Sequence, residues 1–363
     1  MNELMVHYSL QSDALGHLTS AVQFGFISGT LLFAVLTIAD RFSPSRVFFV
    51  SSILGALFNL GVLWDGNSFY SLITLRFLTG FFLAGIYPVG MKIAADYYRK
   101  GLGKSLGFLV GALVVGTAFP HLLREVSRDV PWIWVIVITS VLAATGGLLM
   151  LLFVKDGPYR TPGQKLDFSA FFRVFKNRSF RAAAFGYFGH MWELYAFWAF
   201  VPVMLAAYNS LNPTNIFSVP LWSFVIIGIG GLACVMGGYI SERLGTKRTA
   251  TWALFLSGIC CLISPWMLST GQSWVFIVFL LFWGMVVIAD SPLFSTLVAQ
   301  NATSEVKGTA LTIVNCIGFA ITIVSIQVIT WLGELAPSSY TYMILALGPI
   351  LGLLALRTKV KQE

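Results

Sequence analysis

The chain has 363 residues, of which 57% are hydrophobic and only 10% are charged, and its mean hydropathy is +0.81. A soluble domain of average composition is roughly 25% charged and about 45–50% apolar, so this composition excludes an ordinary soluble protein and a disordered chain. The formal net charge of +8 would suit a nucleic-acid partner only in a soluble protein, and the placement of the basic residues explains it differently.

Eleven apolar stretches follow one another along the chain. Each is close to the roughly 20 residues that an α-helix needs to cross about 30 Å of hydrocarbon. They cover residues 17–39, 46–64, 69–95, 102–122, 131–154, 181–205, 217–241, 246–269, 274–299, 308–332 and 338–356. None alternates polar and apolar residues as a membrane β-strand does. The sequence therefore predicts an all-α, polytopic protein whose surroundings are the lipid bilayer.

The basic residues indicate how the chain is oriented in the membrane. Nineteen Lys and Arg residues fall in one set of alternate loops, and only Arg124 and Arg128 fall in the other. Because Lys and Arg accumulate on the cytoplasmic side, we expect a cytoplasmic tail at 357–363 and an extracytoplasmic segment at 1–16. The positive charge is then a consequence of topology, and no nucleic-acid partner is expected. The membrane would be the plasma membrane or a bacterial inner membrane.

The longest polar segment, residues 155–180, divides the chain into two helical bundles. It contains Gly157, Pro158, Pro162 and Gly163, and it is too short to fold alone. We therefore expect a cytoplasmic linker at 155–180, an N-terminal bundle at 17–154 and a C-terminal bundle at 181–356.

An internal repeat relates these two bundles. Residues 36–46, LTIADRFSPSR, align with residues 238–248, GYISERLGTKR, at an offset of 202. Gly80 and Pro88 align with Gly284 and Pro292 at an offset of 204. The halves are therefore predicted to be one duplicated bundle. The stretch 181–205 has no counterpart in the first half, so we expect the chain to lack the first helix of a twelve-helix protein.

The repeated loop resembles the signature of the major facilitator superfamily, which follows the second helix of each half. Its second copy has glycine, an acid–arginine pair, glycine and a basic pair at the expected spacing, whereas the first copy has Leu36 and Ser43 in place of glycines. The resemblance implies two pseudo-symmetric bundles, with eleven spans visible of twelve. It also implies transport by alternating access, with no cofactor and no enzymatic activity.

The loop is a candidate gate, because an acid at the C-terminal end of a helix faces the negative end of the helix dipole and needs a positive partner. In the family, that contact forms and breaks as the two halves rock. The alternative is that the loop only caps helices and fixes their orientation. The candidate residues are Asp40, Arg41, Arg46, Gly238, Glu242, Arg243, Gly245, Lys247 and Arg248.

Arg76 lies about 10 Å into the span that begins near residue 69. Charges at such depth usually face a water-filled cavity or a partner. The pattern Arg76, Gly80, Ala84 resembles a fourth-helix motif of the family, in which the arginine borders the cavity and takes part in proton coupling or anion binding. The alternative is a structural clamp on backbone carbonyls.

The span 181–205 carries His190 and Glu193 three residues apart, on one face of the predicted helix. Burial disfavours the charged form of both groups, so either can exchange a proton during a transport cycle. The alternative is a neutral hydrogen-bonded Glu193–His190 pair that only ties helices together. Trp192 and Tyr195 are candidates for contact with substrate, although aromatic side chains here also suit packing.

Asp290 precedes Pro292 inside an apolar span and predicts a polar, kinked site. It is either a further proton-coupling group facing the cavity or the partner of a buried cation. The resemblance places Arg76, Glu193 and Asp290 on three of the four helices that line the family's cavity.

These residues predict a proton-coupled secondary transporter that moves a small organic solute. A permanently charged arginine favours an anion. The alternatives are an efflux antiporter for drugs or metabolites and a non-transporting membrane sensor. An enzyme is not expected, because the four histidines are scattered and neither a serine elbow nor metal-ligand spacing occurs. The expected partners are a small-molecule substrate, protons and the bilayer.

Overall fold

The computed structural model describes residues 2–10, 14–98, 102–126, 131–160, 174–213, 216–302, 307–335 and 339–357. Within these ranges the secondary structure is helical without strands, and ten helices are long and apolar enough to cross a membrane. The all-α polytopic fold is therefore confirmed. The eleventh expected span is shorter: a 3₁₀ helix, η1 (Ser339–Ala346), continues into α16 (Leu347–Leu356).

The chain forms two compact units. The first comprises Met1–Leu102 and Ser127–Asp167. Its helices are α1 (Asn2–His7), α2 (Ala14–Val35), α3 (Ile38–Arg41), α4 (Pro44–Gly61), α5 (Phe69–Leu83), α6 (Tyr87–Tyr97) and α8 (Ile133–Phe153). In this unit α2 packs along α5, and α4 packs along both α5 and α8.

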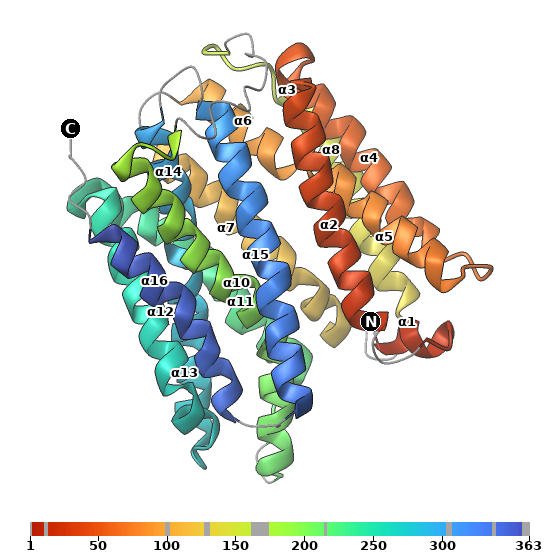
Figure 1. Cartoon of the computed structure of the whole chain (residues 1–363). Helices are drawn as coiled ribbons and strands as arrows, with labels where there is room; N and C mark the ends of the chain where they lie inside the picture. The colour runs from red at the N-terminus through yellow and green to blue at the C-terminus, as the bar shows by residue number, and fades with distance from the viewer. Residues whose placement is uncertain are drawn as a thin grey trace. The chain divides into compact units, whose positions relative to one another are not determined.

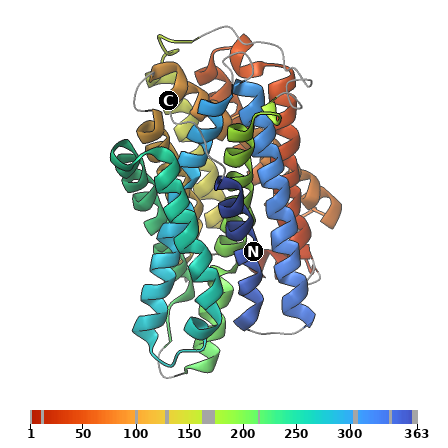
Figure 2. The same ribbon diagram turned by 60° about the vertical axis from the view of Figure 1, so that its left-hand side comes forward.

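The second unit comprises Gly103–Val126 and Phe168–Glu363. Its helices are α7 (Leu102–Val126), α10 (Arg178–Leu211), α11 (Val219–Leu244), α12 (Thr246–Leu268), α13 (Ser273–Ala289), α14 (Ser291–Asn301), α15 (Lys307–Leu335), η1 and α16. The long helix α10 lies against α14, α15 and α16 (Figure 1). Figure 2 shows α12 and α13, in teal and cyan, side by side.

One helix groups differently from the expected bundle boundaries. Helix α7 falls within residues 17–154, yet Gly103–Val126 clusters with the second unit. Two of its glycines allow the approach, because a Cβ at Gly107 would lie 2.9 Å from the Cys234 carbonyl oxygen and one at Gly111 would lie 2.8 Å from that of Gly231. Small residues permit such close helix contact in membranes. The bundle and linker limits stay predictions, and residues 161–173 of the linker lie outside the described ranges.

A proline interrupts one apolar stretch in each unit. Helix α5 ends at Leu83 and α6 begins at Tyr87 with Pro88, while α13 ends at Ala289 and α14 begins at Ser291 with Pro292. Proline lacks the N–H that would continue the helix, but its fixed φ suits the first helical turn. The kink expected near Pro292 is thus a break between two helices, and it places Asp290 at the junction.

The internal repeat extends to the way the helices pack. Gly80 of α5 lies against the carbonyl of Val22 in α2, with no room for a Cβ. Gly284 of α13 lies in the same way against the carbonyl of Ile226 in α11. Gly284 follows Gly80 by 204 residues, and Ile226 follows Val22 by the same number. Each unit therefore repeats the same glycine-mediated packing, as a duplicated bundle should.

Candidate functional site

A buried contact between a histidine and an aspartate joins α10 to the break between α13 and α14. His190 Nδ1 lies 2.8 Å from Asp290 Oδ1, and the two side chains are 1% and 0% exposed. The distance is that of an ion pair, although the geometry is not that of a hydrogen bond. On the far side of each group, His190 Nε2 and Asp290 Oδ2 are buried and have no hydrogen-bond partner. The pair thus retains one nitrogen and one oxygen for a further polar ligand.

Glu193 has different partners from the one expected for it. Trp283 Nε1 in α13 donates to Glu193 Oε1 over 2.6 Å, and Ser257 Oγ in α12 donates to Oε2 over 2.9 Å. The Ser257 hydroxyl also lies 3.1 Å from the Leu254 carbonyl, its alternative acceptor. The interpretation of a Glu193–His190 pair is therefore wrong, because His190 contacts Asp290 instead.

The hydrogen bonds of Glu193 can be satisfied whether or not it carries a proton. An ionised Glu193 accepts from both Trp283 and Ser257. A protonated Glu193 can donate to the Ser257 oxygen, while Ser257 donates to Leu254 and Trp283 keeps its acceptor. A buried group whose two protonation states are both hydrogen-bonded can exchange a proton without leaving a polar atom unpaired.

The charges of this polar cluster, defined as His190, Glu193 and Asp290, can balance. In the described ranges, no Lys or Arg side chain lies within ion-pairing distance of either carboxyl group. A net charge buried away from water is costly. The cluster is neutral when it holds two protons, for instance one on His190 and one on Glu193 beside an ionised Asp290. With either proton absent, the cluster carries a net negative charge.

The candidate aromatic residues on α10 take part in packing. Trp192 Nε1 donates to the Ile344 carbonyl in η1 over 3.2 Å. The ring of Tyr195 packs edge-on against Trp198 and Phe319 at centroid distances of 5.2 and 5.4 Å. His190 instead lies between the rings of Tyr187 and Phe294, at 6.1 Å from each. These contacts favour the packing interpretation for Trp192 and Tyr195.

In the first unit, Arg76 of α5 points to a polar group on α4. Its Nη1 donates to Asn59 Oδ1 over 3.3 Å, and Asn59 Nδ2 donates to Ser140 Oγ of α8 over 2.9 Å. The guanidinium has neither a carboxylate nor a backbone carbonyl as partner within the described ranges, and its Nε is buried without one. The alternative of a clamp on backbone carbonyls is therefore not what the structure contains.

The second copy of the loop motif brings α11 to the start of α7. Gly238 lies beside the backbone of Lys104, whose ammonium group sits 4.2 Å from the centre of the Tyr239 ring and interacts favourably with Glu242. Gly245 ends α11 at φ 88°, a left-handed conformation that favours glycine. A positive group of α7 thus interacts with the acid of this motif, and the gating role of the loop stays a prediction.

Most of the other residues in the two loop copies are exposed or lie at helix ends. Glu242, Arg243 and Arg248 are exposed, and Lys247 is half-buried. In the first copy, Arg41 ends α3 and Arg46 lies in the first turn of α4, whereas the side chain of Asp40 lies outside what the structure describes. Ser43 there donates to Asp156, which holds the start of the linker against this loop.

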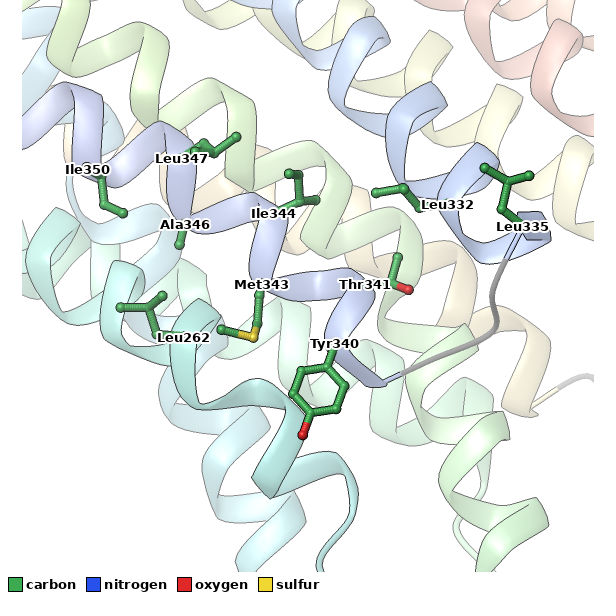
Figure 3. A pocket seen from close by; sticks show the side chains of 10 residues that line it. All are labelled: Leu262, Leu332, Leu335, Tyr340, Thr341, Met343, Ile344, Ala346, Leu347 and Ile350. Carbon is green, nitrogen blue, oxygen red and sulfur yellow. The ribbon is translucent and has the colours of Figure 1, made fainter.

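An apolar groove of about 650 Å³ lies elsewhere in the second unit (Figure 3). It shares no residue with the polar cluster and contains no charged side chain, so its chemistry suits hydrocarbon rather than an ion. Its lining is Leu262, Leu332, Leu335, Tyr340, Thr341, Met343, Ile344, Ala346, Leu347 and Ile350. Among the residues that are described, no three or more His, Cys, Asp and Glu side chains gather to hold a metal ion.

Sequence reasoning missed Trp283, Ser257 and Asn59. Trp283 and Ser257 lie 90 and 64 residues from Glu193, and Asn59 lies 17 residues from Arg76, on other helices. Only Asn59 carried a signal, as a carboxamide inside an apolar stretch.

Comparison with known proteins agrees with this architecture. The family model described as Major Facilitator Superfamily matches residues 1–326. The agnestins efflux protein AgnL12 of Paecilomyces divaricatus is 23% identical over 350 residues, which are 93% of this chain and 75% of that protein. A crystal structure of the E. coli fucose:proton symporter FucP superposes with a TM-score of 0.71 at 14% identity, covering 99% of this chain and 94% of that one.

Proposed function

The chain belongs to the major facilitator superfamily of membrane transporters, and we propose that it is a proton-coupled secondary active transporter that moves a small organic anion by alternating access. We further propose that it lies in the plasma membrane or a bacterial inner membrane with its C-terminus in the cytoplasm. The loop charges support this orientation.

The observation that carries the proton coupling is the buried pair of His190 and Asp290 at the break between α13 and α14. Ionisable groups inside a membrane protein are costly and usually mark ion or substrate pathways. The unpartnered Nε2 and Oδ2 are available to form hydrogen bonds with water or substrate from that pathway. Glu193, with neutral donors only, is the second proton-exchanging group of the proposal.

The anionic cargo is supported by Arg76. Its guanidinium remains charged at any physiological pH and has no carboxylate to neutralise it in the described part of the first unit. A half-buried cation without a counterion is stabilised by an anion from solution, and alternating access would bring that anion in and release it.

Efflux is the second candidate. The AgnL12 relative is named an efflux protein, whereas FucP is named a symporter, and both names belong to proteins less than 25% identical to this chain. The same proton sites would serve either direction, because an antiporter exchanges its proton for substrate at the same groups.

The test begins with the full-length protein in detergent. Carboxylates, sugars, amino acids and lipophilic drugs are screened for compounds that raise its Tm, since a ligand stabilises the state that it binds. The stabilising compound is then followed by radiolabelled uptake into proteoliposomes across an imposed pH gradient.

We expect a proton gradient to drive uptake by the wild type. The gradient is directed inward if the protein is a symporter and outward if it is an antiporter. The Asp290→Asn variant should retain exchange of labelled for unlabelled substrate but lose the response to the gradient. Uptake by the wild type that is identical with and without a gradient would refute proton coupling. Stabilisation by neutral sugars or lipophilic cations alone would refute the anionic cargo.

A further inference from the structure

The guanidinium of Arg76 uses few of its hydrogen-bond donors. It has five N–H groups, yet in the described ranges only Nη1 has a partner, Asn59 Oδ1. The Nε group is buried without an acceptor, and Nη2 makes no hydrogen bond within the same ranges. The edge formed by Nε and Nη2 carries two parallel N–H groups, the arrangement that binds a carboxylate through both oxygens.

The orientation of Asn59 is fixed from the other side. Its amide nitrogen donates to Ser140 Oγ, which is buried on α8, so its oxygen must face Arg76. Helices α4 and α8 hold this geometry through close contact, because Gly147 of α8 has no room for a Cβ beside Ser52 of α4 without movement. The position of the guanidinium is therefore determined by a chain of neutral groups.

An asparagine at this position differs from an aspartate in one consequential respect. Both offer an oxygen to Nη1, but only aspartate would bring a negative charge that neutralises the guanidinium and competes with an incoming anion. Asparagine therefore holds the arginine in place and leaves its charge available.

We propose that Asn59 is a specificity-determining positioning residue, which directs the free Nε–Nη2 edge of Arg76 toward a carboxylate-bearing solute and keeps the site selective for anions. This inference rests on the anionic cargo of the proposed function. Beyond that function, we assign the selectivity to Asn59 and the recognition of the carboxylate to the Nε–Nη2 edge of Arg76.

The test compares Asn59→Asp with Asn67→Asp, a matched change of charge in the loop before α5, where Asn67 bonds to the Gly61 carbonyl. The probes are benzoate and succinate, with benzamide and succinamide as their uncharged counterparts, and the readout is the Tm of the full-length protein. We expect the two anions to stabilise the wild type and Asn67→Asp. In Asn59→Asp the half-saturating concentration of each anion should rise at least about tenfold, because the new carboxylate pairs with Arg76 and competes with the added anion.

A second measurement needs no ligand. In the wild-type background, Asn59→Asp should leave Tm unchanged or raise it, because Arg76 gains a counterion. In an Arg76→Gln background, the same change should lower Tm, because the new carboxylate is left unpaired.

Two results would overturn the inference: an Asn59→Asp variant that binds the anions as tightly as the wild type, or a loss of Tm that is equal in both backgrounds. A wild type that neither anion stabilises would count against the anionic cargo itself. In that case the two-background comparison still decides whether Asn59 faces an uncompensated Arg76.

Discussion

Replacing Glu193 separates its structural role from its proposed role in proton exchange. Glu193→Leu removes the acceptor of Trp283 Nε1, which becomes a buried, unsatisfied donor. Ser257 loses less, since the Leu254 carbonyl 3.1 Å away remains available to its hydroxyl. Glu193→Gln differs, because its amide oxygen can accept from Trp283 and its amide nitrogen can donate to Ser257, as a protonated glutamate would.

The magnitude of the leucine effect follows from the single orphaned donor. A buried unsatisfied donor costs about 1–3 kcal/mol in soluble proteins, while hydrogen bonds between membrane helices average about 0.6 kcal/mol. We therefore expect Glu193→Leu to lower the free energy of unfolding by about 1–2 kcal/mol. Glu193→Gln should stay within about 0.5 kcal/mol of the wild type, the usual range for a change that leaves no polar group unpaired.

The assay is unfolding of the purified protein in mixed micelles, with Trp283→Phe as the matched partner. Once Trp283 is replaced, Glu193→Leu leaves no indole donor unpaired, so its cost should shrink, and the double-mutant cycle measures this coupling. Gradient-driven uptake of the stabilising compound is then measured for Glu193→Gln. We expect exchange of labelled substrate to persist and the response to a pH gradient to fall at least about tenfold, because the amide cannot carry a proton.

Two results would refute this reasoning. Equal losses of stability from Glu193→Leu with and without Trp283 would mean that the hydrogen bond does not contribute. An unaltered response of Glu193→Gln to the pH gradient would remove Glu193 from the proton pathway, whatever its effect on stability.

Three further changes test the His190–Asp290 contact, the close helix packing at Gly284 and the backbone conformation of Gly245. Asp290→Leu removes the carboxyl group that contacts the His190 imidazole and should cost about 3–5 kcal/mol of unfolding free energy if that ring stays charged, measured as in the previous experiment; a cost below about 1 kcal/mol would mean that the pair is not ionic. Gly284→Ala forces a Cβ onto a backbone carbonyl and should cost about 1–3 kcal/mol, whereas Gly116→Ala, which meets nothing within 4 Å, should be neutral in the same measurement. Gly245→Ala should lower the free energy of unfolding by about 1 kcal/mol, because of its φ of 88°, and Gly271→Ala, a control without positive φ, should not.

Much of the fold could be predicted because the determining patterns are local. Apolar length alone located the spans, and Pro292 marked a position where a helix breaks, since a proline acts on its own backbone. The repeat at an offset of 204 also predicted a symmetry that Gly80 and Gly284 confirm through their packing. The shortened last span was not evident, because composition does not distinguish a 3₁₀ segment from an α-helix.

The candidate site was only partly predictable. Sequence reasoning selected His190, Glu193 and Asp290 because ionisable residues stand out in apolar helices. It paired them incorrectly, because two residues on one helical face need not bond to each other when other helices supply donors. Trp283 resembled a packing residue, and nothing local showed that its N–H faces Glu193. Such partners depend on how each helix is rotated about its axis, which the tertiary packing decides.

Proton coupling is tested most directly by the pH inside proteoliposomes during transport. The wild type is reconstituted with a trapped pH-sensitive dye, and the compound that stabilises it is added outside without any imposed gradient. We expect a change of internal pH that accompanies substrate movement and disappears in the Glu193→Gln, Asp290→Asn double variant. Substrate movement at the same rate with no change of internal pH in the wild type would contradict proton coupling.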